Sequence, residues 1–199
     1  MNEPRSRFPV PPVDSLPDDI RARIDAVNEK SGFVPNVFRV LAHRPDEFRA
    51  FFAYHDALME KESGLTKGER EMIVVVTSAM NSCLYCVVAH GAIARIREKN
   101  PRLAEQLSID YTRADISERQ MVMLDFACLI ADQAADATND DFDYLREHGF
   151  SDEDIWDIGA IAAFFALSNR MAGLTDMLPN DEFYTLGREV KSLGPKLVK

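Results

Sequence analysis

Apolar residues recur along most of the chain at the three- and four-residue spacing of amphipathic helices. Patterns of the capping-box type, a Ser or Thr followed three residues later by an acid or Gln, precede three apolar segments, at Thr66, Ser117 and Ser151. The apolar, β-branched run 72–76 is ambiguous and would suit a strand. It follows the first capping pattern and has no convincing partner strand, so we expect it to be helical. The pattern therefore predicts an all-α protein.

Residues 1–199 are expected to form a single domain. Residues 1–14 carry four of the ten prolines and little apolar periodicity. This composition indicates an extended N-terminal arm that could lie over a neighbour. The first helix is expected to follow the arm, with Ser15 as its N-cap and Pro17 in its first turn.

Two longer helical regions follow. Residues 65–99 are expected to form a hairpin of two helices, and residues 117–178 a second helical half without a cysteine pair. Residues 150–177 weakly echo 65–92, with a Ser or Thr, acids and a long apolar stretch in the same order. We interpret this echo as a degenerate internal repeat of the helical hairpin.

Composition narrows the class of protein. The chain is 46% hydrophobic and 28% charged, with a net charge of −10 and Lys and Arg scattered among acids. It has no basic stripe, which argues against nucleic-acid binding. The longest apolar run, 158–167, is too short to span a bilayer, and the N-terminus lacks the apolar core of a signal peptide. With only three cysteines, a cytoplasmic protein without a membrane segment is expected.

The candidate chemistry is a Cys-x-x-Cys motif followed by a histidine. Cys83, Cys86 and His90 are spaced i, i+3 and i+7, so on one helix they share a face. We expect that helix to begin at Asn81 and Ser82, which are good N-cap residues. Both cysteines would then lie in the first turn, near the positive end of the helix dipole.

This arrangement predicts a redox-active dithiol beside a base. A helix N-terminus and a nearby imidazole both favour thiolate over thiol, and two thiols one turn apart can close a disulfide. Glu71 lies in an otherwise apolar stretch, and a buried carboxylate without a partner is costly. His90 is its obvious partner. Ser78 falls on the same helix face as Glu71, where a site role and simple packing are equally consistent with the sequence.

These residues carry a resemblance to a known family. The spacing resembles the active-site signature of alkylhydroperoxidase D (AhpD), within the carboxymuconolactone decarboxylase-like superfamily: Glu71-x11-Cys83-x2-Cys86-x3-His90. Ser78 and Tyr85 within this stretch, and the run 32–39 near the N-terminus, are similar to the branch of peroxidase-related proteins. AhpD itself has a histidine where this chain has Tyr85, which removes one member of the family's proton relay.

The resemblance implies an all-α, AhpD-like multi-helix fold in a homo-oligomer, a dimer or hexamer. It implies a peroxidase that reduces organic hydroperoxides without a cofactor or metal and is re-reduced by a lipoyl-protein or thioredoxin-like donor. By resemblance Cys86 is the peroxidatic thiolate, Cys83 resolves it as a disulfide, and His90 accepts the thiol proton. The two cysteine roles could be exchanged, because sequence does not fix which sulfur is exposed.

Other interpretations stay open. Cys83, Cys86 and His90 are three ligands of the type that zinc prefers, although a structural site needs a fourth. A thioredoxin-like oxidoreductase would need more strands than the pattern offers. The chain could also be a non-catalytic helical oligomer or binding module, in which the cysteine motif is retained but takes part in no reaction. Tyr85 could donate a hydrogen bond into the site or merely cover it. The isolated residues that we assign to packing or surface are Cys128, His43, His55 and His148.

Overall fold

The computed structural model describes residues 4–188. Its α-helices are α1 (Asp18–Ser31), α2 (Asn36–Leu41), α3 (Pro45–Met59), α4 (Lys67–Met80), α5 (Leu84–Glu98), α6 (Leu103–Asp110), α7 (Glu118–Gln133), α8 (Asn139–Glu147), α9 (Asp152–Thr175) and α10 (Glu182–Thr185). Short 3₁₀ turns lie at 13–15, 111–113 and 134–136. No strand occurs between residues 4 and 188, and the ambiguous run 72–76 lies within α4. The all-α prediction is confirmed.

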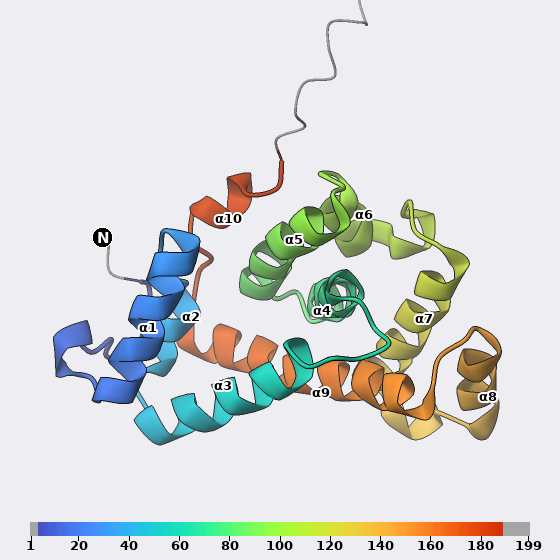
Figure 1. Cartoon of the computed structure of the whole chain (residues 1–199), viewed down its shortest axis with the longest axis horizontal. Coiled ribbons are helices and arrows are strands. Elements are labelled where there is room, and N and C mark those ends of the chain that lie inside the picture. Colours follow the sequence, from blue (N-terminus) through green and yellow to red (C-terminus); the bar gives the residue numbers. More distant parts are fainter. Residues whose placement is uncertain (1–3, 189–199) are drawn as a thin grey trace, which may run out of the picture.

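Helix α4 lies at the centre of the molecule, where Figure 1 shows it nearly end-on. It packs against α5, α6, α7 and α9. Every residue from Gly68 to Ser78 is buried, so α4 has no solvent-exposed face along these three turns. A helix surrounded in this way is a core helix, and the polar side chains on it must find partners inside the protein.

The capping patterns predict the helix starts well. Full capping boxes begin α4, α7 and α9 at Thr66, Ser117 and Ser151. The prediction that Ser15 caps the first helix is wrong, because α1 begins at Asp18 with Pro17 as its N-cap. The Ser15 hydroxyl instead donates to the Pro12 carbonyl at 2.7 Å and closes the preceding 3₁₀ turn.

The described part of the N-terminal arm lies on its own chain. The backbone N–H of Arg7 donates to the Thr175 carbonyl at 2.9 Å, and Arg7 Nη1 donates to the Gly173 carbonyl at 2.8 Å. Arg5 pairs with Asp176 at 2.6 Å. The two bonds from Arg7 go to carbonyls in the last turn of α9, and Arg5 adds an ion pair at the same helix end. Residues 1–3 of the predicted arm lie outside the described residues.

Helices α4 and α5 form the hairpin expected at 65–99. The predicted second copy of this hairpin is wrong, because residues 152–175 form one uninterrupted helix, α9. By length and composition alone α9 could cross a membrane, with a hydropathy of 1.3 over its most apolar window, and half of that window is buried inside the protein. Such burial is also found in the core helices of folded domains, and α9 runs along α4 and α7.

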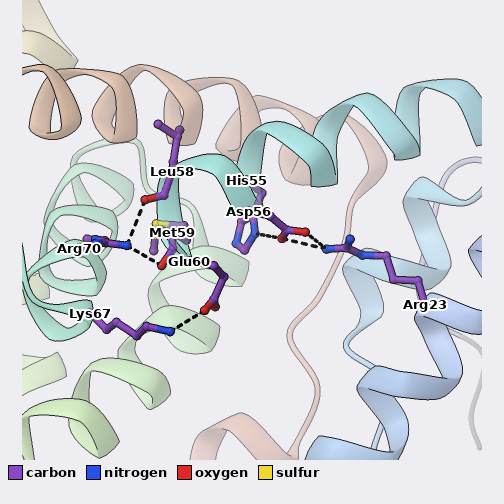
Figure 2. Close-up of polar contacts among 8 residues, drawn as sticks. All are labelled: Arg23, His55, Asp56, Leu58, Met59, Glu60, Lys67 and Arg70. Carbon is purple, nitrogen blue, oxygen red and sulfur yellow. Dashed lines mark hydrogen bonds and ion pairs between the residues drawn. The ribbon is translucent and has the colours of Figure 1, made fainter. Parts of the chain in front are cut away.

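The guanidinium of Arg70 ties the end of α3 to the start of α4 (Figure 2). Arg70 is 2% exposed and has no carboxylate partner among residues 4–188. It donates instead to four carbonyl oxygens, those of Leu58, Met59, Lys61 and Leu65. The first two are terminal carbonyls of α3, which have no partner within that helix. Arg70 therefore closes α3 and fixes the loop that leads into the central helix.

We expect Arg70→Met to lower the free energy of unfolding by about 2–4 kcal/mol, because it leaves buried carbonyls without donors. Lys67→Met is the matched control from the same helix. It removes an ion pair with Glu60 in which both side chains are about half exposed, so its cost should stay below about 1 kcal/mol. Urea denaturation measures both values. Equal stabilities for the two variants would contradict the role given to Arg70.

Candidate active site

The two cysteines lie where α4 ends and α5 begins. Asn81 is the C-cap of α4, and Cys83 is the N-cap of α5, so the predicted start at Asn81 and Ser82 is wrong. The Asn81 side chain donates backwards, to the Thr77 carbonyl at 3.0 Å, and Ser82 adopts a left-handed backbone with φ of 52°. Cys86 therefore occupies the third helical position, where its backbone N–H points toward the N-cap side chain.

The surroundings of the cysteines differ. Cys83 is 7% exposed and Cys86 only 1%. The pKa of Cys83 is lowered to about 6, first by the Cys86 side chain, against burial, and then by the backbone N–H of Cys86, the Asn169 side chain and the charge of His90. The pKa of Cys86 is raised, by the neighbouring Cys83 sulfur and by burial. The Cys86 sulfur lies 3.8 Å from the hydroxyl oxygen of Ser168. These opposite pKa shifts favour a thiolate on Cys83 beside a thiol on Cys86.

Glu71 and His90 form the predicted pair. His90 Nδ1 lies 2.7 Å from Glu71 Oε2, and the side chains are only 14% and 11% exposed. The His90 ring stands edge-on to Phe165 of α9, with 4.8 Å between ring centroids. A carboxylate at this distance fixes the orientation of the imidazole ring, which suits a side chain that accepts and returns a proton.

Ser78 takes part in the site through α9. Its side chain is fully buried, and its hydroxyl oxygen accepts a hydrogen bond from Asn169 Nδ2 at 2.9 Å. Asn169 Oδ1 in turn accepts from Asn81 Nδ2 at 3.1 Å. The Ser78 carbonyl accepts the backbone N–H of Cys83 at 2.9 Å. Ser78 therefore bonds to α9 through its hydroxyl and to the cysteine turn through its carbonyl.

Tyr85 does not point into the site. Its hydroxyl oxygen accepts the backbone N–H of Val37 at 3.1 Å, and the ring is 5% exposed. Burial raises the pKa of Tyr85, so the phenol stays neutral. Val37 is the second residue of α2, whose N–H has no partner within that helix. Tyr85 therefore links α2 to the cysteine helix, and among residues 4–188 its hydroxyl has no hydrogen bond to either cysteine.

His55 of α3 lies close enough to Glu71 and His90 for their charges to affect its pKa. No sequence motif surrounds His55. Its Nδ1 lies 3.1 Å from Asp56 Oδ1, and Asp56 also pairs with Arg23 at 2.8 Å (Figure 2). The pKa of His55 is lowered, mainly by burial and further by the charge of His90. His55 is therefore a neutral imidazole near pH 7, bordering the site.

The contribution of α9 is what the sequence analysis missed. Phe165, Ser168 and Asn169 come from a segment that the motif does not include, and two of them are polar and buried. The signal was present in the sequence. Ser168 and Asn169 interrupt the most apolar helix of the chain, beside the core positions Phe165 and Ala172. Polar residues on the buried face of such a helix need hydrogen-bond partners inside the protein, which is the signal that points to this region.

Two further features concern ligands. Within residues 4–188, no group of three or more His, Cys, Asp and Glu side chains is placed to hold a metal ion.

A mostly apolar cavity of about 740 Å³ lies between the arm, α2, α3 and α9. Its lining includes Phe164, Leu167 and Met171 of α9 but neither cysteine. The cavity and the cysteine site therefore lie on different faces of α9. Cys128 is half-buried in α7, where its sulfur lies beside Tyr111.

Comparisons with known proteins identify the family of this chain. A family model described as the carboxymuconolactone decarboxylase family matches residues 45–108. The structure is similar to that of an alkylhydroperoxidase AhpD core, an uncharacterized peroxidase-related protein from Ralstonia eutropha JMP134. That protein is 64% identical, with 96% of this chain and 100% of the other covered and a TM-score of 0.94. This chain belongs to the AhpD-like family of the carboxymuconolactone decarboxylase superfamily. The family indicates an enzyme of the AhpD kind.

Two further solved structures extend the comparison. A peroxidase-related protein from Silicibacter sp. TM1040 is 42% identical, covers 94% of this chain and 100% of its own, and has a TM-score of 0.88. The debrominase Bmp8 is 20% identical, with 90% of this chain and 94% of its own covered and a TM-score of 0.74, a likeness of fold alone. A comparison with curated proteins gave no significant match.

The pKa difference between the cysteines gives a direct prediction. Because a thiolate forms above its pKa, the alkylation rate of Cys83 should rise with a midpoint near pH 6. Cys86→Ala removes the largest cause of the shift, so the midpoint should move up by about one unit or more. Iodoacetamide labelling followed by peptide mass spectrometry measures it. Cys128→Ala is the control and should leave the midpoint unchanged. A midpoint near pH 8.5 in the unmodified protein would contradict the account.

Proposed function

We propose that this AhpD-like chain is a cysteine-dependent peroxidase that reduces organic hydroperoxides through a thiolate–disulfide cycle. The observation that carries the proposal is the placement of the Cys83–Cys86 dithiol beside a buried Glu71–His90 pair joined at 2.7 Å. The arrangement supplies a thiolate, a second thiol one helical turn away and a proton-transfer group, as this chemistry requires. Two relatives of 64% and 42% identity are named peroxidase-related proteins, which supports it.

In the first step Cys83 attacks the hydroperoxide. The thiolate sulfur bonds to the terminal oxygen, the O–O bond breaks, and the alkoxide leaves with the electron pair of that bond. The His90 imidazolium, which took its proton from the Cys83 thiol, gives that proton to the alkoxide, so an alcohol departs. Cys83 becomes a sulfenic acid, oxidised by two electrons. Glu71 keeps the His90 ring oriented through both proton transfers.

In the second step Cys86 resolves the sulfenic acid. Its sulfur attacks the Cys83 sulfur, the S–S bond forms, and the sulfenic oxygen leaves as water with the proton of the Cys86 thiol. Burial of Cys86 at 1% exposure supports this resolving role, because the hydroperoxide reaches the more exposed Cys83 first. This order is the reverse of the one that the resemblance favoured from sequence, in which Cys86 attacked.

The cycle closes when an external dithiol reduces the disulfide. We propose a lipoyl-protein or a thioredoxin-like protein as this reductant, since both supply two electrons through a thiol pair. Met80 and Leu84 flank the cysteine turn and are 46% and 52% exposed, which supports contact with an apolar substrate or carrier there. We also propose a homo-oligomer, a dimer or hexamer. Half-exposed Tyr54, Leu167 and Leu174 provide apolar surface for subunit contact.

Variants of the two cysteines test the proposal. Cys83→Ser should abolish consumption of cumene hydroperoxide in the presence of a dithiol reductant, because no thiolate remains to attack. Cys86→Ser should still consume about one equivalent per chain and then hold a sulfenic acid on Cys83, which dimedone labelling and mass spectrometry detect.

Cys128→Ser is the matched control and should keep the turnover of the unmodified protein. Full turnover by Cys83→Ser would overturn the attacking role of Cys83. If neither the unmodified protein nor any variant consumes hydroperoxide, the peroxidase proposal fails and the chain is a non-catalytic member of its family.

A further inference from the structure

Asn169 is held in a single orientation at the cysteine turn. Its side chain is buried, with the residue 5% exposed. Asn169 Nδ2 donates to Ser78 Oγ at 2.9 Å, and Asn169 Oδ1 accepts from Asn81 Nδ2 at 3.1 Å. The Asn81 amide is itself fixed, because it also donates to the Thr77 carbonyl at 3.0 Å. Turning the Asn169 amide over would place two NH₂ groups face to face, so the amide cannot flip.

The bond to Ser78 leaves the second hydrogen of the Asn169 amide available to another acceptor. An asparagine NH₂ group carries two hydrogens, and the bond to Ser78 uses one. The Asn169 side chain also acts on both sulfurs, lowering the pKa of Cys83 and opposing the rise of the pKa of Cys86. The preceding residue, Ser168, lies 3.8 Å from the Cys86 sulfur, which places this turn of α9 directly against the dithiol.

We infer that Asn169 is a catalytic residue of the dithiol site, donating its second amide hydrogen to the negatively charged sulfur of Cys83. A donor fixed in advance stabilises developing or transferred charge without reorganising at the moment of reaction. The chain Thr77–Asn81–Asn169–Ser78 supplies that fixation from α4 and α9. The inference rests on the proposed function only in taking the Cys83 thiolate as the reactive form.

The cost of burying Asn169 favours this role over simple packing. A buried amide loses its bonds to water, and an apolar side chain of the same size would fill the space in α9 at no such cost. Asn169 lies on the core-facing side of the most apolar helix, next to the core residues Phe165 and Ala172. Its hydrogen-bonding capacity is used toward the cysteine turn.

Asn169→Leu tests the inference, because leucine matches asparagine in size and removes the donors. The measurement is the pH midpoint of iodoacetamide labelling at Cys83, which needs no hydroperoxide and no reductant. We expect the midpoint to rise by about one unit, so that labelling below the midpoint slows about tenfold. Asn169→Asp should raise it as well, because a carboxylate oxygen replaces the donor. Ser78→Ala should shift it in the same direction by less, because it only loosens the amide.

Asn180→Leu is the matched control. Asn180 also bonds through both ends of its amide, to Asn36 and Val34, and lies outside the dithiol site. The Asn180→Leu variant should have a lower melting temperature and an unchanged pH midpoint of Cys83 labelling. An unchanged midpoint in Asn169→Leu, with or without a fall in melting temperature, would overturn the inference. If that variant does not fold, an unchanged midpoint in both Asn169→Asp and Ser78→Ala overturns it.

Labelling and turnover separate this inference from the proposed function. The labelling midpoint of Cys83 could rise in the Asn169 variants while the unmodified protein consumes no hydroperoxide. That result would support the role of Asn169 at the thiolate and reject the peroxidase proposal.

Discussion

The burial of α4 on all sides constrains the rest of the structure. Because residues 68–78 have no access to water, each polar side chain among them must find its hydrogen-bond partner inside the protein. The Thr77 hydroxyl donates to the Ile73 carbonyl within α4, and the other polar side chains bond to other elements. The partners come from four directions: Glu69 pairs with Arg119 of α7, Arg70 with carbonyls that include the end of α3, Glu71 with His90 of α5, and Ser78 with Asn169 of α9. The bonds that satisfy the buried polar side chains of α4 also position the helices around it.

The candidate site is a consequence of this arrangement. Two of these contacts involve the helices next to the cysteine turn: Glu71 bonds to His90 of α5, and Ser78 bonds to Asn169 of α9. Glu71 orients the imidazole of His90, and Ser78 orients the amide of Asn169. Because all four side chains are mostly buried, water competes little for these bonds. The site therefore depends on the packing of α4, α5 and α9 together, and the cysteine motif alone does not define it. Helix α9 contributes no cysteine, yet it supplies one side of the dithiol's surroundings.

Local signals in the sequence predicted much of the fold. Capping boxes at Thr66 and Ser151 gave helix starts because both partners lie within four residues, and the apolar spacing gave the helices. The Glu71–His90 pair was predictable because a carboxylate in an apolar run needs a nearby partner. The turn before Cys83 was not, since Asn81 serves α4 and Asn169 instead of capping α5. That choice depends on a residue 88 positions away, which local patterns do not contain.

The central claim is that Cys83 and Cys86 form one redox couple, with Cys128 apart. Titration of free thiols in the denatured protein, before and after one equivalent of an organic hydroperoxide, tests it most directly. The chain has three cysteines. The account predicts three thiols before treatment, one after it, and three again after reduction by a dithiol. Three thiols remaining after the hydroperoxide would contradict it.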